Sequence, residues 1–175
     1  FAAVDTASPQ AADQLEVAVR DLGLAGLTLD PGFGDPPRYV DDPLFEPLYR
    51  RCARLGVPVM VTYSGHAGPD IGYADPVRID RVAAAFPDVS IVVVHAGWPW
   101  VPQILGVAFR RPNIFLSPDM YLNVPNMPGS LEYVRAANYY LRERLIFGTA
   151  YPARPMVESV EHFHRLPFDE DVKPY

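Results

Sequence analysis

Short apolar runs alternate with amphipathic helical patterns along the sequence, and this alternation most constrains the fold. Six segments read as strands: Phe1–Asp5, Gly26–Asp30, Val57–Tyr63, Val89–His95, Asn113–Ser117 and Leu145–Gly148. Six helical patterns lie between and after them: Ala11–Leu22, Asp42–Leu55, Asp75–Phe86, Trp100–Phe109, Leu131–Arg142 and Met156–Arg165. Strands of continuous apolar residues alternating with such helices predict an α/β fold, in which helices cover a parallel sheet.

Local capping signals support these boundaries. Two helical patterns begin with an aspartate followed by proline, at Asp42 and Asp75, and two end at a glycine, Gly23 and Gly56. Both an open doubly wound sheet and a (β/α)8 barrel fit the pattern. No GxGxxG, P-loop, GxSxG, CxxC or HExxH motif is present, so the main sequence support for a dinucleotide fold is missing.

Composition limits the classes of partner and compartment. The 175 residues are 49% hydrophobic, which predicts one domain over residues 1–175. The net charge of -6 and the lack of a basic run argue against nucleic acid or an anionic membrane as partner. Cys52 is the single cysteine and lies inside a helical pattern, which predicts packing and a reducing cytosol. With no recognisable signal peptide and no apolar run of about 18 residues, we expect a cytoplasmic protein.

Polar residues follow most of the predicted strands, where parallel α/β folds carry their chemistry. His95 ends the most β-branched strand and precedes Ala96-Gly97, so its ring can serve as a metal ligand or as an acid and base. Asp119 could be a base or ligand, and His66 lies in the loop SGHAGPD. The alternatives are a histidine hydrogen-bonded within the loops, a turn aspartate after proline, and a surface histidine.

Further side chains at these strand ends are candidates for substrate binding. Arg154 could hold a carboxylate as a fork, although an exposed loop arginine is the alternative. Trp98 could form a pocket wall or pack inside the loops. The remaining candidates are Thr62, Tyr121 and Tyr151.

Four stretches resemble the amidohydrolase superfamily, in the branch of aminocarboxymuconate-semialdehyde decarboxylase, resorcylate decarboxylases and related hydrolases. IVVVHAGWPW resembles the sixth-strand motif, and RLIFGTAYP is similar to the eighth-strand motif F-G-[ST]-D-[YW]-P. GLAGLTLDP and DDPLFEPLYRRCARLGVPVMV resemble the fourth strand and the helix that leads into the fifth. The resemblance implies a (β/α)8 TIM barrel, of which this sequence carries strands three to eight. The first strand, with a His-x-His metal pair, is expected before Phe1.

The resemblance also implies a divalent metal, zinc or manganese, but the ligand positions depart from the family pattern. That pattern places a histidine at the end of strand five, often one at the end of strand six, and an aspartate at strand eight. Here Thr62 and Ala150 occupy the first and last of these positions, and only His95 matches. A threonine hydroxyl is a poor ligand and alanine is none, so we expect a reduced or absent metal site. Ala150 also removes the carboxylate that accepts a proton in the family.

Three functions remain open. The first is an amidohydrolase-fold hydrolase or decarboxylase that acts on a small carboxylated or aromatic substrate, with His95 as acid and base and Asp119 or His66 assisting. The second is a conventional metal-dependent enzyme with ligands upstream of Phe1. The third is a non-catalytic barrel that binds a ligand or pairs with an active partner. The polar strand ends favour the first, and the resemblance makes a homodimer the expected assembly.

Overall fold

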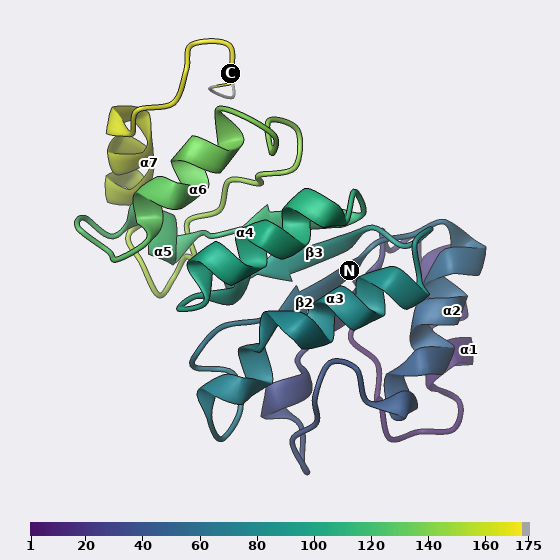
Figure 1. Ribbon diagram of the computed structural model, residues 1–175. Coiled ribbons are helices and arrows are strands. Elements are labelled where there is room, and N and C mark those ends of the chain that lie inside the picture. Colours follow the sequence, from purple (N-terminus) through teal and green to yellow (C-terminus); the bar gives the residue numbers. More distant parts are fainter. Residues whose placement is uncertain (173–175) are drawn as a thin grey trace.

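The computed structural model describes residues 1–172, in which four parallel strands form one sheet (Figure 1). They pair in the order in which they occur in the chain: β1 Leu27–Leu29, β2 Val59–Thr62, β3 Ile91–Val94 and β4 Ile114–Ser117. A doubly wound sheet reverses its strand order at a switch point, whereas a barrel adds each strand beside the preceding one. The observed order is therefore that of a barrel segment.

The first and last strands, expected at Phe1–Asp5 and Leu145–Gly148, are shorter than predicted. Each is a single parallel bridge at an edge of the sheet, Ala2 with Leu27 and Leu145 with Leu116. The backbone still bonds as a parallel strand there, since the Ala2 N–H donates to the Gly26 carbonyl (2.7 Å) and the Ile146 N–H to the Leu116 carbonyl (2.8 Å). Within residues 1–172, each of these edge segments pairs with one strand only, so its backbone hydrogen bonds to the sheet lie on one side.

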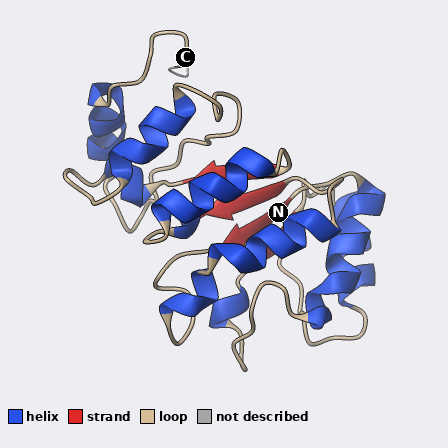
Figure 2. Cartoon of the chain, viewed as in Figure 1, coloured by secondary structure: helices blue, strands red, loops and turns tan. Residues whose placement is uncertain are grey.

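Within residues 1–172, seven α-helices lie before, between and after the strands (Figure 2). They are α1 Ala11–Arg20, α2 Glu46–Leu55, α3 Pro76–Ala85, α4 Val101–Arg110, α5 Met120–Asn123, α6 Ser130–Ala137 and α7 Met156–Arg165. The sequence did not predict α5, and α6 ends earlier than the expected Arg142. No helix in the part of the chain that the structure describes is long and apolar enough to cross a membrane.

The predicted helix signals act as expected. The Asp42 carboxylate accepts a hydrogen bond from the Leu44 N–H, and a short 3-10 turn, Pro43–Phe45, precedes α2. The Asp75 carboxylate caps α3 in the same way. Gly56 ends α2 in the left-handed conformation that glycine adopts without a steric penalty. Cys52 is fully buried, which confirms its packing role.

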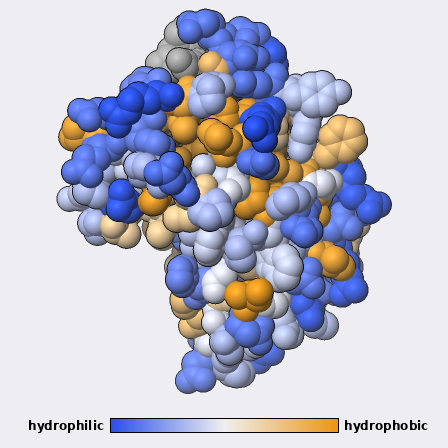
Figure 3. All heavy atoms as spheres, turned by 60° about the vertical axis from the view of Figure 1, so that its left-hand side comes forward, coloured by the Kyte–Doolittle hydropathy of each residue, from blue (hydrophilic) through white to orange (hydrophobic). Residues whose placement is uncertain are grey.

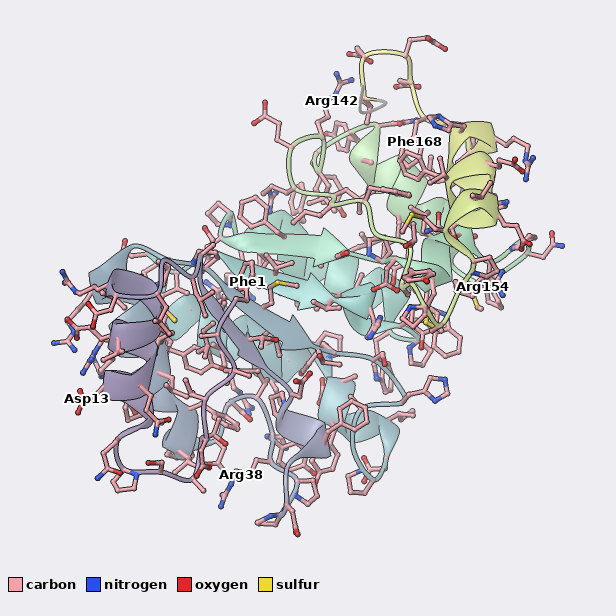
Figure 4. The ribbon with its side chains drawn as sticks, turned by 180° about the vertical axis from the view of Figure 1, so that it is seen from behind. Phe1, Asp13, Arg38, Arg142, Arg154 and Phe168 are labelled. Atoms are coloured by element: carbon pink, nitrogen blue, oxygen red, sulfur yellow. The ribbon has the colours of Figure 1, made fainter. Side chains whose placement is uncertain are left out.

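The two faces of the sheet differ in burial. In-register residues on one face are completely buried, as with Val59, Ile91 and Ile114. Their neighbours along each strand, such as Met60 and Val92, are only half-buried. Helices α3 and α4 lie in front of the sheet in Figure 1, and the strands are nearest the viewer from behind in Figure 4. Helices therefore cover one face, as they cover the outside of a barrel.

Candidate active site

The carboxyl ends of the strands all open on the same side of the sheet. Figure 3 brings this side toward the viewer and shows apolar atoms gathered between hydrophilic margins. A cavity of about 450 Å³ lies beyond these strand ends. Its lining comes from five loops: Phe33, Thr62, Ser64, His66, His95, Met120, Tyr121, Ala150, Tyr151, Pro152 and Ala153.

His95 and Asp119 form a pair at the floor of this cavity. The His95 Nδ1 atom lies 2.8 Å from Asp119 Oδ2, and the same oxygen accepts the His95 backbone N–H at 3.2 Å. Nδ1 is buried and makes no aligned hydrogen bond, so its contact with Asp119 Oδ2 is one of close approach. The His95 side chain is 25% exposed, while that of Asp119 is 6% exposed. The accessible part of the ring is therefore its other edge, which carries Nε2.

Left-handed backbone at residues other than glycine concentrates around this pair. Within residues 1–172, five such residues have a positive φ. Four of them lie just beyond the carboxyl ends of strands: His95 (66°), Ala96 (47°), Asp119 (36°) and Ala150 (57°). A side chain with a Cβ is strained in this region, and strain of this kind collects at functional sites because the surrounding structure must hold it. The tertiary structure therefore holds the backbone at these strand ends in a conformation that its own residues disfavour.

Asp119 owes its position to the short helix α5. Its carboxylate accepts the Met120 N–H at the start of that helix through Oδ1, which leaves Oδ2 free for His95. The last strand segment fits closely against it. A Cβ added to Gly148 would lie 3.3 Å from the Asp119 Cβ, and the Asn123 side-chain amide donates to the Gly148 carbonyl at 2.7 Å. Glycine at position 148 thus allows the close approach that brings Ala150 to the cavity.

An aromatic wall stands beside the pair. Tyr121 is 3% exposed, its ring stacks on Trp98 with centroids 4.7 Å apart, and it meets the His95 ring edge-on. Burial raises the pKa of the Tyr121 hydroxyl, a hydrogen bond with Ser64 opposes that rise, and the Asp119 charge adds to it. The hydroxyl therefore keeps its proton at neutral pH and can donate a hydrogen bond.

Five predicted residues meet at this cavity: Thr62, His66, His95, Tyr121 and Tyr151. Two others support it from behind, because Asp119 pairs with His95 and Trp98 stacks on Tyr121 without lining the space. Arg154 does not line the cavity, and Figure 4 shows it beside the start of α7.

Sequence reasoning missed Phe33 and Met120 among the lining residues. Ser64, which also lines the cavity, directly follows a predicted strand and belongs to the predicted polar strand ends, but no role was predicted for it. Phe33 lies in a glycine and proline loop, and its exposure of 62% depends on how that loop folds back over the strand ends. Met120 enters the lining through α5, which has no signal in the sequence.

Thr62 engages a second carboxylate. Its hydroxyl donates to the Asp30 Oδ1 atom at the end of the neighbouring strand. The residue at the family's histidine position therefore donates the proton of its hydroxyl to Asp30.

Among residues 1–172, no three His, Cys, Asp or Glu side chains lie close enough together to hold an ion. Of the three family positions on this chain, only His95 carries a donor that zinc or manganese prefers.

Comparisons with known proteins agree with this architecture. A family model described as amidohydrolase matches residues 1–174, whereas no curated protein sequence matches the chain significantly. Among solved structures, an uncharacterised TIM-barrel protein from Bordetella bronchiseptica is 45% identical, with a TM-score of 0.91. The match covers 97% of this chain and 60% of that one, so the chain spans about three fifths of that relative. This likeness confirms the predicted TIM-barrel fold, of which the chain forms a part.

Two decarboxylases share the fold at lower identity. One is 5-carboxyvanillate decarboxylase from Sphingomonas paucimobilis, with 20% identity, a TM-score of 0.73, and coverage of 98% of this chain and 62% of that chain. The other is a dihydroxybenzoic acid decarboxylase from a Polaromonas species, solved with bound manganese and the inhibitor 2-nitroresorcinol. It has 20% identity, a TM-score of 0.70, and coverage of 98% and 64%.

Proposed function

The chain belongs to the amidohydrolase family, and from this premise we propose that it is an enzyme in which His95 is the acid and base at the cavity beyond the strand ends. The substrate in this proposal is a small carboxylated or aromatic molecule, and the reaction is a decarboxylation or a hydrolysis. The single observation that supports it most is the 2.8 Å contact between His95 and Asp119 at the cavity floor.

The pair gives each residue a distinct role. The Asp119 carboxylate lies 2.8 Å from the buried Nδ1 atom of His95 and favours the tautomer that carries its proton on this atom. Nε2, on the accessible edge, then takes a proton from the substrate or from water, or returns one. Acid–base catalysis of this kind contributes about 10²- to 10⁴-fold in rate. Asp119 contacts His95 but does not itself line the cavity, so we assign it as the positioning partner of His95.

The cavity walls suit a planar substrate. Phe33, Tyr121 and Tyr151 offer aromatic faces, and the hydroxyls of Ser64 and Tyr121 can donate or accept hydrogen bonds. His66 lines the same space and is the second titratable group there. In a decarboxylation, the carbon that loses CO₂ would keep the electron pair of the broken bond and take its proton from His95.

No step of this proposal passes through a metal. The Polaromonas decarboxylase was solved with manganese, but the residues described in this chain supply one good donor at the family positions. A metal held by His95 and by ligands outside the given sequence is the alternative, and metal analysis separates it from the proposal.

The test uses protein made from the complete gene and purified without a chelator. Aromatic and aliphatic carboxylates are screened, with CO₂ release and hydrolysis products measured separately. His95→Ala should lower kcat by about 10²-fold or more, whereas His164→Ala, at an exposed site on α7, should leave it unchanged. Full activity in His95→Ala would overturn the proposal, and no activity on any substrate would favour a non-catalytic barrel.

Metal content is measured on the same preparations by mass spectrometry. The proposal predicts that the metal content of wild type and His95→Ala is equal. About one zinc or manganese per chain that is lost with His95→Ala would instead support the metal-dependent alternative.

A further inference from the structure

A buried tyrosine reaches the turn that carries His95 from a distant part of the chain. Tyr133, on α6, is completely buried, and its hydroxyl donates to the Ala96 carbonyl at 3.0 Å. Helix α6 packs against α4 and α5, beside the strand ends (Figure 1). The contact therefore joins the cavity turn to a helix 37 residues away in sequence.

The turn that Tyr133 contacts is unusual. His95, Ala96 and Gly97 all have positive φ, at 66°, 47° and 69°. The first two carry a Cβ, so their own preferences oppose this conformation. Bonds from the surroundings must hold the turn, because local propensity does not.

Hydrogen bonds of both the backbone and side chains hold this turn. The Gly97 N–H donates to the Tyr63 carbonyl at 2.9 Å, and the Trp98 N–H to the His95 carbonyl at 3.2 Å. Two side chains also hold the turn by hydrogen bonds: Asp119, which accepts the His95 N–H, and Tyr133. Asp119 pairs with His95 itself, whereas Tyr133 acts on the backbone next to it.

The Tyr133 hydroxyl is in its protonated form and can donate a hydrogen bond. Burial raises the pKa of this hydroxyl far above its ordinary value, and the charge of Asp119 and the neighbouring Tyr121 raise it further. It therefore keeps its proton at neutral pH and can donate to the Ala96 carbonyl there.

We propose that Tyr133 is a positioning residue for His95. The Tyr133 hydroxyl fixes the left-handed turn and thereby the distance between His95 and Asp119. The inference rests on the proposed role of His95. It adds a residue that does not line the cavity and that no strand-end pattern in the sequence indicates.

The test compares Tyr133→Phe with Tyr49→Phe. Tyr49 is a matched control, because it is 1% exposed and its hydroxyl also donates to a single backbone carbonyl, that of Val40 at 2.9 Å, but on α2. Both variants should lose similar global stability. Only Tyr133→Phe should speed hydrogen exchange at the His95 amide, by about fivefold to tenfold beyond the global change, since one hydrogen bond of the turn is lost.

Activity gives the second readout. On a substrate accepted by the wild type, Tyr133→Phe should lower kcat by about 10- to 100-fold with little change in KM, and Tyr49→Phe should change neither. Equal His95 exchange in the two variants would overturn the inference, whatever the activity. Retained activity in His95→Ala would overturn the proposed function instead, so the two failures are distinguishable.

A measurement on the wild type guards against poor folding of the variants. The Tyr133 hydroxyl proton should give a slowly exchanging NMR signal with a nuclear Overhauser contact to Ala96. A rapidly exchanging hydroxyl at this position would contradict the proposed role.

Discussion

Replacement of Asp119 by asparagine tests the floor of the cavity most directly. The asparagine side chain has nearly the same shape, and its oxygen can still accept the Met120 N–H. Its NH₂ group then replaces Oδ2, which lies 2.8 Å from the His95 Nδ1 atom and 3.2 Å from the His95 backbone nitrogen. The substitution thus removes the acceptor of the His95 backbone N–H and places a donor beside the His95 Nδ1 atom.

The structure sets the magnitude. The Asp119 side chain is only 6% exposed, so water cannot replace the lost acceptor. A buried N–H left without a partner costs about 1–3 kcal/mol, and this is the expected loss in the free energy of unfolding. Each kcal/mol lowers Tm by about 2–4 °C in a chain of this length. The ring can avoid the clash by moving its proton to Nε2, but that tautomer cannot act as a base, so kcat should fall by about 10²-fold or more.

Urea denaturation measures the change in the free energy of unfolding, and steady-state kinetics on an accepted substrate measures the change in kcat. Asp75→Asn is the matched control, because Asp75 also caps a helix and asparagine is an equally good cap. It should change stability by a few tenths of a kcal/mol and leave kcat unchanged. A folded Asp119→Asn protein with wild-type kcat would refute the pairing as the basis of acid–base catalysis.

Two further predictions concern packing and pH. Gly148→Ala places a Cβ 3.3 Å from the Cβ of Asp119 and should cost about 1–3 kcal/mol in unfolding free energy, whereas Gly106→Ala, with nothing within 4 Å on α4, should not destabilise. Burial and a neighbouring arginine keep the pKa of His162 below its ordinary value of 6.5. The unfolded chain therefore binds more protons, and stability falls as pH drops below that value. His162→Asn should flatten this fall in urea titrations across pH, with His164→Asn as control, and an unchanged slope would contradict the assignment.

Much of the fold was predictable because its signals are local. The capping carboxylates of Asp42 and Asp75 act within two residues of their own position. The strand interiors were read from apolar runs that the parallel sheet buries. The outer strand segments, at Ala2 and Leu145, came out shorter than predicted, because pairing at a sheet edge depends on neighbours that the local sequence does not describe.

Some of the residues that line the cavity could be chosen from the sequence, whereas the contacts among them could not. His95 could be chosen because a histidine directly after a buried strand stands at the working end of the sheet. The pairing of Thr62 with Asp30 could not be chosen, since it joins residues 32 positions apart across two strands. Phe33 entered the cavity through the path of a loop, which no periodicity encodes.

The sequence by itself thus determined the order of strands and helices and the polar residues at the strand ends, because periodicity and capping act over a few residues. Tertiary structure alone decided that Asp119 pairs with His95 and that the Tyr133 hydroxyl donates to the Ala96 carbonyl beside it. These contacts require left-handed backbone at His95, Ala96 and Asp119, which residues with a Cβ resist on their own. Contacts from distant parts of the folded chain, among them those of Asp119 and Tyr133, hold that conformation.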